Sequence, residues 1–145
     1  RNLQFNLSHA KDLALYALTY GHPIGIDIEF IDRQVDIDGI SQRFFAPNEG
    51  LVFQSFTTDE KVPGFFRAWT RKEALLKAMG LGLFFSLADC EVTFRKEELP
   101  KIVSINQDWK KGEQWAVYSF NPNSQSIAAI VVANPQAFFT HCRVE

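Results

Sequence analysis

The sequence predicts an α+β fold in which a mainly antiparallel sheet packs on one long helix. Three observations lead to this fold class: β-prone segments open the chain, one long helical period occupies its middle, and β-prone segments close it. Strands, then helices, then strands in a single chain are typical of such domains. The 145 residues are enough for one domain that buries roughly 68–70% of its unfolded surface. We therefore expect residues 1–145 to form a single domain.

The first part of the chain predicts three strands. Leu3–Leu7 and Leu13–Tyr20 are apolar and β-prone, and the polar residues between them predict a hairpin turn. Gly21–Pro23 predicts a second turn, which leads into a strand at Ile24–Glu29.

The strand "IGIDIE" carries two acids. Because alternate residues of a strand face opposite sides, Asp27 and Glu29 are expected on the face opposite the three isoleucines. Like charges at neighbouring positions repel, so the pair is either solvated or arranged around something positive.

Helices are predicted in the middle of the chain. "DGISQRFF" indicates a short helix that begins near Asp38, and "PNEGLVFQSF" indicates another with Pro47 in its first turn. The longest helical signal follows Pro63 and ends at Gly80. Its apolar positions recur with a helical period, at Phe66, Trp69, Leu76 and Met79.

The last third predicts strands again. They lie at Cys90–Phe94, Gln114–Phe120 and Ile127–Ala133, with a lysine-rich turn near Lys110–Gly112.

Composition excludes several classes. The balance of 15 Lys+Arg against 17 Asp+Glu gives a net charge of -2, whereas nucleic-acid-binding proteins carry a basic excess. The chain contains no apolar run of about 18 residues, the minimum for a membrane span. Cys90 and Cys142 fit no metal-ligand spacing and predict two reduced thiols. We expect a cytoplasmic protein without nucleic-acid or membrane partners.

The long helix carries the text "WTRKEALLK". Residues four apart share a helix face, so Trp69, Glu73 and Lys77 form one stripe, while Lys72 lies about 100° away. Taken alone, Glu73 and Lys77 would be a surface ion pair worth roughly 0.3–0.5 kcal/mol, and Trp69 would be a core residue.

Other motifs favour a site. Gly80 and Gly82 leave bare backbone after the helix, and "NLSHA" ends a strand with Ser8 and His9. Carboxylates, a lysine, a hydroxyl and an imidazole together are what a magnesium-held phosphate ester requires.

These motifs, in this order, resemble those of a known family. "FNLSHA", "IGID", "RFFAPNE" and "WTRKEALLK" match the 4'-phosphopantetheinyl transferases of the larger, surfactin-synthetase-activating (Sfp-like) type. The resemblance implies transfer of the 4'-phosphopantetheine arm of coenzyme A to a serine of an apo acyl or peptidyl carrier protein.

The resemblance also implies residue roles. Asp27, Glu29 and Glu73 would hold Mg²⁺, or alternatively Mn²⁺, against the pyrophosphate of coenzyme A. Lys77 would neutralise a pyrophosphate oxygen. Ser8 and His9 would contact the phosphates, with His9 on the 3'-phosphate; by itself, His9 would equally be a strand-end histidine.

Two carboxylates are candidate bases for the carrier serine. Glu73 is the first choice and Glu49 the second. Glu49 would equally be a helix-start carboxylate that the helix dipole favours.

Partners follow from the same resemblance. The larger type folds as two similar halves, and this chain matches the second, so we expect the N-terminal half of the same enzyme to be a partner and its segment to lie upstream. The alternative is a half-module that binds metal and coenzyme A without catalysis. Arg33, Arg43 and Phe44 or Phe45 are candidate contacts for an acidic carrier protein, although both phenylalanines would also fit a core.

Overall fold

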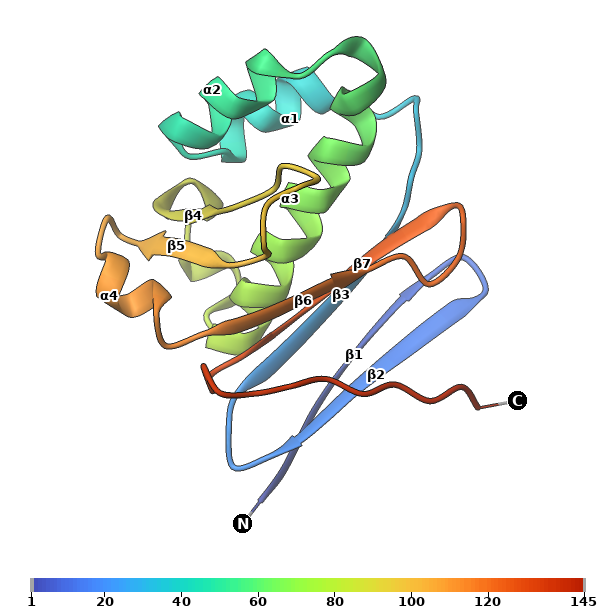
Figure 1. Ribbon diagram of the computed structural model, residues 1–145, viewed down its shortest axis with the longest axis vertical. Helices are drawn as coiled ribbons and strands as arrows, with labels where there is room; N and C mark the ends of the chain where they lie inside the picture. The colour runs from blue at the N-terminus through green and yellow to red at the C-terminus, as the bar shows by residue number, and fades with distance from the viewer. Residues whose placement is uncertain (1, 145) are drawn as a thin grey trace.

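The structure, a computed structural model that describes residues 2–144, is an α+β domain built on antiparallel sheets and one long helix (Figure 1). The strands are β1 (Leu3–Ala10), β2 (Leu13–Tyr20), β3 (Ile24–Phe30), β4 (Cys90–Val92), β5 (Ile102–Ile105), β6 (Ala116–Phe120) and β7 (Ser126–Val132). The helices are α1 (Ile37–Phe44), α2 (Pro47–Ser55), α3 (Thr58–Met79) and α4 (Trp109–Gly112), with short 3₁₀ turns η1 (Gly82–Phe84) and η2 (Leu87–Asp89). The predicted fold class is confirmed.

The predicted N-terminal hairpin is confirmed. β1 and β2 pair antiparallel from Leu3↔Tyr20 to Ala10↔Leu13. Lys11 in the turn has a positive φ of 56°, the left-handed conformation that tight turns between strands require.

The central sheet has the strand order β3-β7-β6, and all its pairs are antiparallel. One face of β3 packs against α3, and the opposite face packs against the hairpin through Ile24, Ile26 and Ala17. Asp27 and Glu29 therefore lie on the face toward α3. The alternation predicted from "IGIDIE" is correct, and the acid pair faces the long helix instead of open solvent.

Gly25 permits the close contact between β3 and α3. A Cβ atom at this position would lie 2.1 Å from the carbonyl oxygen of Ala74 and 2.6 Å from the amide nitrogen of Ala78. Both are backbone atoms of a helix, so no side chain can rotate away to make room. The glycine of "IGID" is thus required by helix–strand packing.

We expect Gly25→Ala to destabilise the domain by about 3 kcal/mol, the upper range for overpacking, because α3 must move away from β3. Urea unfolding measures the change. Gly50→Ala in α2 is the matched control, since a Cβ there meets nothing within 4 Å. Equal stability of the two variants would contradict the proposed reason for Gly25.

The long helix begins earlier than predicted. α3 starts at Thr58, and Pro63 lies inside it. The prediction was wrong because a capping box at Thr57, in which the Glu60 carboxylate accepts from the Thr57 amide at 2.9 Å, starts the helix before the proline. A proline in the second turn removes only one helical hydrogen bond. The end at Gly80 is confirmed, with φ 69° at that residue.

The C-terminal part departs from the prediction in two places. β5 was not predicted, and the expected lysine-rich turn is the short helix α4. β5 has only four residues, too short for a clear alternating pattern. The other predicted strands are present with ends that differ by a few residues.

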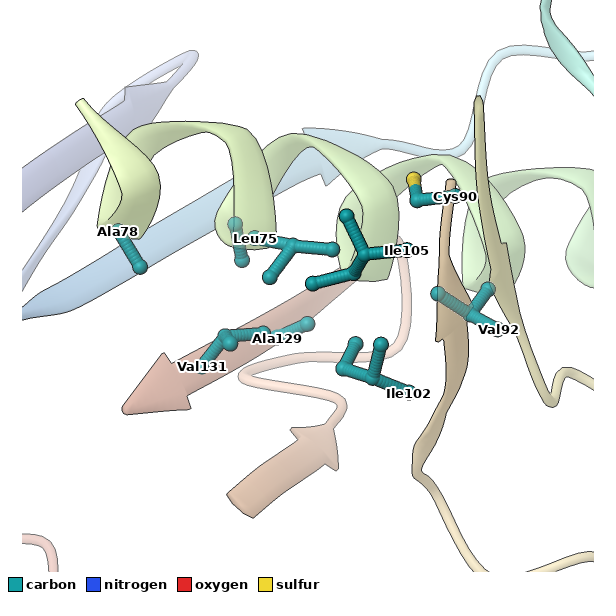
Figure 2. Packing of buried hydrophobic residues seen from close by; sticks show 9 residues of the cluster. Leu75, Ala78, Cys90, Val92, Ile102, Ile105, Ala129 and Val131 are labelled. Carbon is teal, nitrogen blue, oxygen red and sulfur yellow. The ribbon is translucent and has the colours of Figure 1, made fainter. Parts of the chain in front are cut away.

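The main core lies between α3, β7 and the β4–β5 pair (Figure 2). Leu75 from the helix packs with Ala129 and Val131 of β7, and Val92 and Ile102 close the cluster from β4 and β5. This packing fixes the helix face that carries Leu75, so the stripe of Glu73 and Lys77 turns toward β3. No helix within residues 2–144 combines the length and apolar character needed to cross a membrane.

Candidate active site

The predicted acid cluster forms where β3 faces α3. Asp27 and Glu29 project from β3, and Glu73 projects from α3 close enough for its charge to raise the pKa of Asp27. Lys77, one helical turn after Glu73, completes the group. The structure thus brings together two segments that are far apart in sequence, as the family resemblance implied.

Lys77 pairs with Asp27 across the helix–strand interface. Its Nζ lies 3.6 Å from Asp27 Oδ1 and donates a 2.8 Å hydrogen bond to the carbonyl oxygen of Ile26. The side chain of Lys77 remains 32% exposed, so it can also reach an anionic ligand. Lys77 therefore pairs with Asp27 of β3 and not with Glu73 on its own helix.

Asp27 is the most buried member of the cluster. Only 6% of the residue is exposed, and its Oδ2 has no hydrogen-bond partner within the described residues. Burial, followed by the charge of Glu29, raises the pKa of Asp27 to about 8, although Lys77 opposes the shift. One lysine does not balance the negative charge of this cluster.

The pKa values of the other two acids, Glu29 and Glu73, are also raised. Burial raises the pKa of Glu29, although the nearby side chains of Asp27, Lys77 and Trp69 oppose the rise. Burial and then the charge of Glu29 raise the pKa of Glu73. The Trp69 ring stacks on Phe65 with 5.9 Å between the ring centroids. The core role predicted for Trp69 is confirmed.

The cluster fits a hard divalent cation. An orphaned buried carboxylate oxygen and three carboxyl groups with raised pKa values are what a bound cation would relieve. Within residues 2–144, no group of three or more acidic, histidine or cysteine side chains is arranged to hold a metal ion by itself. Mg²⁺ suits such a partial site, because it is commonly held by one or two carboxylates with substrate phosphates and water as further ligands.

The pKa of Asp27 predicts a pH dependence of stability. Its folded-state value of about 8 lies above the ordinary 3.8, so the folded state binds more protons between these values. The free energy of unfolding of the metal-free protein should therefore fall as the pH rises from about 4 to about 8.

Asp27→Asn should remove this contribution. In EDTA, we expect the variant to be more stable than the native protein by roughly 1–3 kcal/mol at pH 8 and nearly equal at pH 4, where Asp27 is neutral in the folded state and only partly ionised in the unfolded state. Urea unfolding at both pH values measures the difference. If the difference in the free energy of unfolding between the two proteins is the same at both pH values, the pKa of Asp27 is not raised in the folded state.

Ser8 and His9 lie on opposite faces of β1. The hydroxyl oxygen of Ser8 is buried and accepts a 3.1 Å hydrogen bond from the amide of Ile28. His9 is exposed on the outer face of the hairpin, opposite Ala14. Ser8 therefore adjoins the strand that carries the acids, whereas His9 points away from its β3-facing side.

Glu49 lies in a different environment. It is 1% exposed and forms a buried ion pair with Lys72 of α3. Its Oε1 also accepts from the amide of Ala46 at 2.8 Å, and its Oε2 accepts from the amide of Val92 at 2.7 Å. The helix-start interpretation is correct: the carboxylate caps α2 and ties it to β4. These contacts occupy both oxygens and argue against its role as second-choice base.

Lys72 is a residue whose role the sequence did not reveal. It is completely buried, and its Nζ donates to the carbonyl of Cys90 at 2.6 Å as well as to Glu49. A lysine beside an exposed stripe normally extends into solvent. The joint occurrence of the motifs "WTRKE" and "RFFAPNE" could have indicated this role, because Lys72 of the first and Glu49 of the second form one buried ion pair.

The candidate carrier contacts are divided between core and surface. Phe45 is a core residue, 6% exposed, so the core alternative is correct for it. Phe44 is half-buried and packs edge-on against Trp69 at 5.7 Å, with the Arg43 guanidinium over its ring at 5.1 Å. Arg33 is exposed in the loop after β3.

A pocket of about 410 Å³ lies away from the acid cluster, between the start of α2, β4 and the end of β5. Its lining includes Asn48, Glu91 and Asn106 but none of the acid cluster. We take the acid cluster as the candidate functional site, because within residues 2–144 it alone combines buried carboxylates, a carboxylate oxygen without a hydrogen-bond partner and a lysine of α3 that contacts β3.

Comparison with known proteins agrees with the motifs. The family described as "4'-phosphopantetheinyl transferase superfamily" matches residues 23–131. The 4'-phosphopantetheinyl transferase HetI of Nostoc sp. is 36% identical over 131 residues, which are 90% of this chain and 52% of that protein. The 4'-phosphopantetheinyl transferase gsp of Aneurinibacillus migulanus is 38% identical over 86 residues, covering 59% of this chain and 35% of that protein. The chain thus spans about half the length of HetI.

Solved structures share the fold. A holo-(acyl-carrier-protein) synthase from Bacillus anthracis, crystallised in complex with CoA (3',5'-ADP), superposes with a TM-score of 0.58 at 24% identity. The match covers 76% of this chain and 93% of that one. At this identity, the likeness establishes the architecture only.

Proposed function

The chain belongs to the 4'-phosphopantetheinyl transferase superfamily, and we propose that it takes part in moving the 4'-phosphopantetheine group of coenzyme A onto a serine of an apo acyl or peptidyl carrier protein. The observation that carries this proposal is the acid cluster of Asp27, Glu29 and Glu73 with Lys77 beside it. Both motifs that form it lie within the residues that match the family.

The proposed reaction is a phosphoryl transfer. The serine oxygen forms a bond to the phosphorus that carries the pantetheine arm, and the bond from this phosphorus to the adenosine 3',5'-bisphosphate leaving group breaks. Glu73 accepts the serine proton, a role to which its raised pKa is suited. Lys77 stabilises the negative charge that develops on the pyrophosphate oxygens.

We assign Asp27, Glu29 and Glu73 as the residues that would hold Mg²⁺ or Mn²⁺. Bound there, the cation would neutralise charge on the phosphate oxygens. Ser8 and His9 remain proposed phosphate contacts, Ser8 through its hydroxyl proton and His9 only for a phosphate that reaches the outer face of the hairpin.

Metal removal tests the proposal. We expect Mg²⁺ or Mn²⁺ to support transfer, followed as the mass increase of the carrier protein, and excess EDTA to abolish it. Restoring Mg²⁺ should restore the rate, which separates metal loss from unfolding. Undiminished transfer in EDTA would exclude the metal assignment.

We propose further that the chain corresponds to the C-terminal half of the larger, two-half type of transferase and works with an N-terminal half. One support is the match to about half of HetI. The other is the outer face of the β1–β2 hairpin, on which large apolar and tyrosine side chains of the two strands lie next to each other. The residues on this face are 45–66% exposed: Leu3, Phe5, Leu7, Tyr16, Leu18 and Tyr20. Contiguous apolar surface of this kind marks an interface.

The second candidate function is a half-module that binds metal and coenzyme A without transfer, which the chain's limited span of its relatives favours. Calorimetry with coenzyme A and mass spectrometry of the carrier distinguish the two. Binding without a mass increase would support the half-module, whereas a mass increase with this chain alone would exclude it.

Carrier recognition and location complete the proposal. Arg33, Arg43 and the exposed part of Phe44 are proposed contacts for an acidic carrier protein. We assign the protein to the cytoplasm, because both Cys90 and the exposed Cys142 are free thiols.

A further inference from the structure

β1 and β3 lie side by side but are joined by side chains instead of a backbone ladder. They belong to separate sheets, yet they are in extensive contact. Asn6 Oδ1 accepts a 2.9 Å hydrogen bond from the amide of Ile26, and Ser8 Oγ accepts a 3.1 Å bond from the amide of Ile28. The two bonds therefore fall on either side of Asp27.

This arrangement determines what the edge of β3 can bind. β1 and β3 run in the same direction, since Asn6 faces Ile26 and Ser8 faces Ile28, and in a parallel backbone pair the neighbouring strand would supply both donors and acceptors to β3. Here β1 supplies acceptors from its side chains, and the carbonyl oxygen of Ile26 instead accepts from Lys77 Nζ at 2.8 Å. Ile26 thus contacts Asn6 through its amide and Lys77 through its carbonyl.

Lys77 depends on this carbonyl for its position. Its Nζ is 2.8 Å from the Ile26 oxygen but 3.6 Å from Asp27 Oδ1, so the backbone contact is the closer of the two. If β1 paired with β3 through its backbone, an amide of β1 would compete for the Ile26 carbonyl. Lys77 would then lose its anchor beside Asp27.

We propose that Asn6 is a positioning residue for the acid cluster: by accepting the Ile26 amide, it fixes the strand next to Asp27 and leaves the Ile26 carbonyl to Lys77. The inference rests on the proposed function, and it concerns how the cation and phosphate site is held, not the transfer itself. Ser8 performs the same task on the other side of Asp27.

The test compares Asn6→Leu with Asn6→Asp and Gln4→Leu. Leucine removes the acceptor at nearly constant size, whereas aspartate keeps an acceptor oxygen. Gln4 lies on the same face of β1, and within residues 2–144 its side chain makes no hydrogen bond to β3, so Gln4→Leu is the matched control. The measurements are Mn²⁺ affinity by calorimetry and hydrogen exchange of the Ile26 amide.

We expect Asn6→Leu to weaken Mn²⁺ binding by roughly ten- to hundredfold, as for other residues that orient metal ligands. The Ile26 amide should exchange faster than the change in global stability explains. Asn6→Asp should retain Mn²⁺ affinity and amide protection, and Gln4→Leu should behave like the native protein.

Other outcomes would overturn the inference. A folded Asn6→Leu variant with native Mn²⁺ affinity would show that Asn6 only stabilises the fold. If Asn6→Leu fails to fold, loss of the Ile26 amide protection in Asn6→Asp would equally exclude the role. Neither measurement requires transfer, so the mass assay of the carrier protein tests the proposed function separately from this inference.

Discussion

Replacing Glu73 with glutamine is expected to slow phosphopantetheine transfer by roughly 10²–10⁴-fold while the domain stays folded. Glutamine preserves shape and helix propensity, but it removes a negative charge from the cluster and the proposed acceptor of the serine proton. Because Glu73 is only half-buried and its charge lies among other carboxylates, loss of the charge should not destabilise α3.

Carrier mass increase under single-turnover conditions gives the rate, and circular dichroism confirms the fold. Glu97→Gln makes the same chemical change at an exposed position outside the acid cluster and should leave the rate unchanged. Near-native transfer by a folded Glu73→Gln variant would show that Glu73 is needed neither as a base nor as a metal ligand.

Replacing Lys72 with methionine is expected to cost about 3–5 kcal/mol in the free energy of unfolding. Methionine fills much of the same space, but the Glu49 carboxylate, 1% exposed, would lose the charge that pairs with it. Burial already raises the pKa of Glu49 against the effect of Lys72, so without the lysine the carboxylate should be protonated at neutral pH or pull α2 away from α3.

Urea unfolding measures the loss. Lys61→Met is the matched control, because Lys61 pairs with Asp38 at 3.8 Å near the surface and should cost less than about 1 kcal/mol. Combining Lys72→Met with Glu49→Gln should recover part of the stability, since a neutral amide tolerates burial better than an unpaired charge. An additive double variant would show that the two side chains are not energetically coupled.

The acid cluster could be predicted because its information is local. The alternation of "IGIDIE" places two acids on one face of β3, and the four-residue spacing of "WTRKEALLK" places Trp69, Glu73 and Lys77 on one face of α3. Periodicity alone fixes such faces. Their meeting was inferred from the resemblance, and the structure confirms it.

The hairpin shows where local pattern is insufficient. In β1, the apolar residues Leu3, Phe5 and Leu7 are exposed, while Asn6 and Ser8 face β3. The usual rule would bury the apolar face. Alternation identifies two faces but not which of them meets the rest of the domain, because this depends on what packs beside the strand.

The sequence by itself therefore determined the α+β class, the hairpin, the central strand, the end of α3 at Gly80 and the two faces that carry the acids, since each depends on residues within about one or two turns or strand repeats. The tertiary structure decided the rest: the buried pair of Lys72 with Glu49, the contact of Lys77 with the Ile26 carbonyl, and the reversed faces of β1. These contacts join residues 20–51 positions apart, and their partners are selected by burial and hydrogen-bond satisfaction across the assembled domain, which no local period encodes.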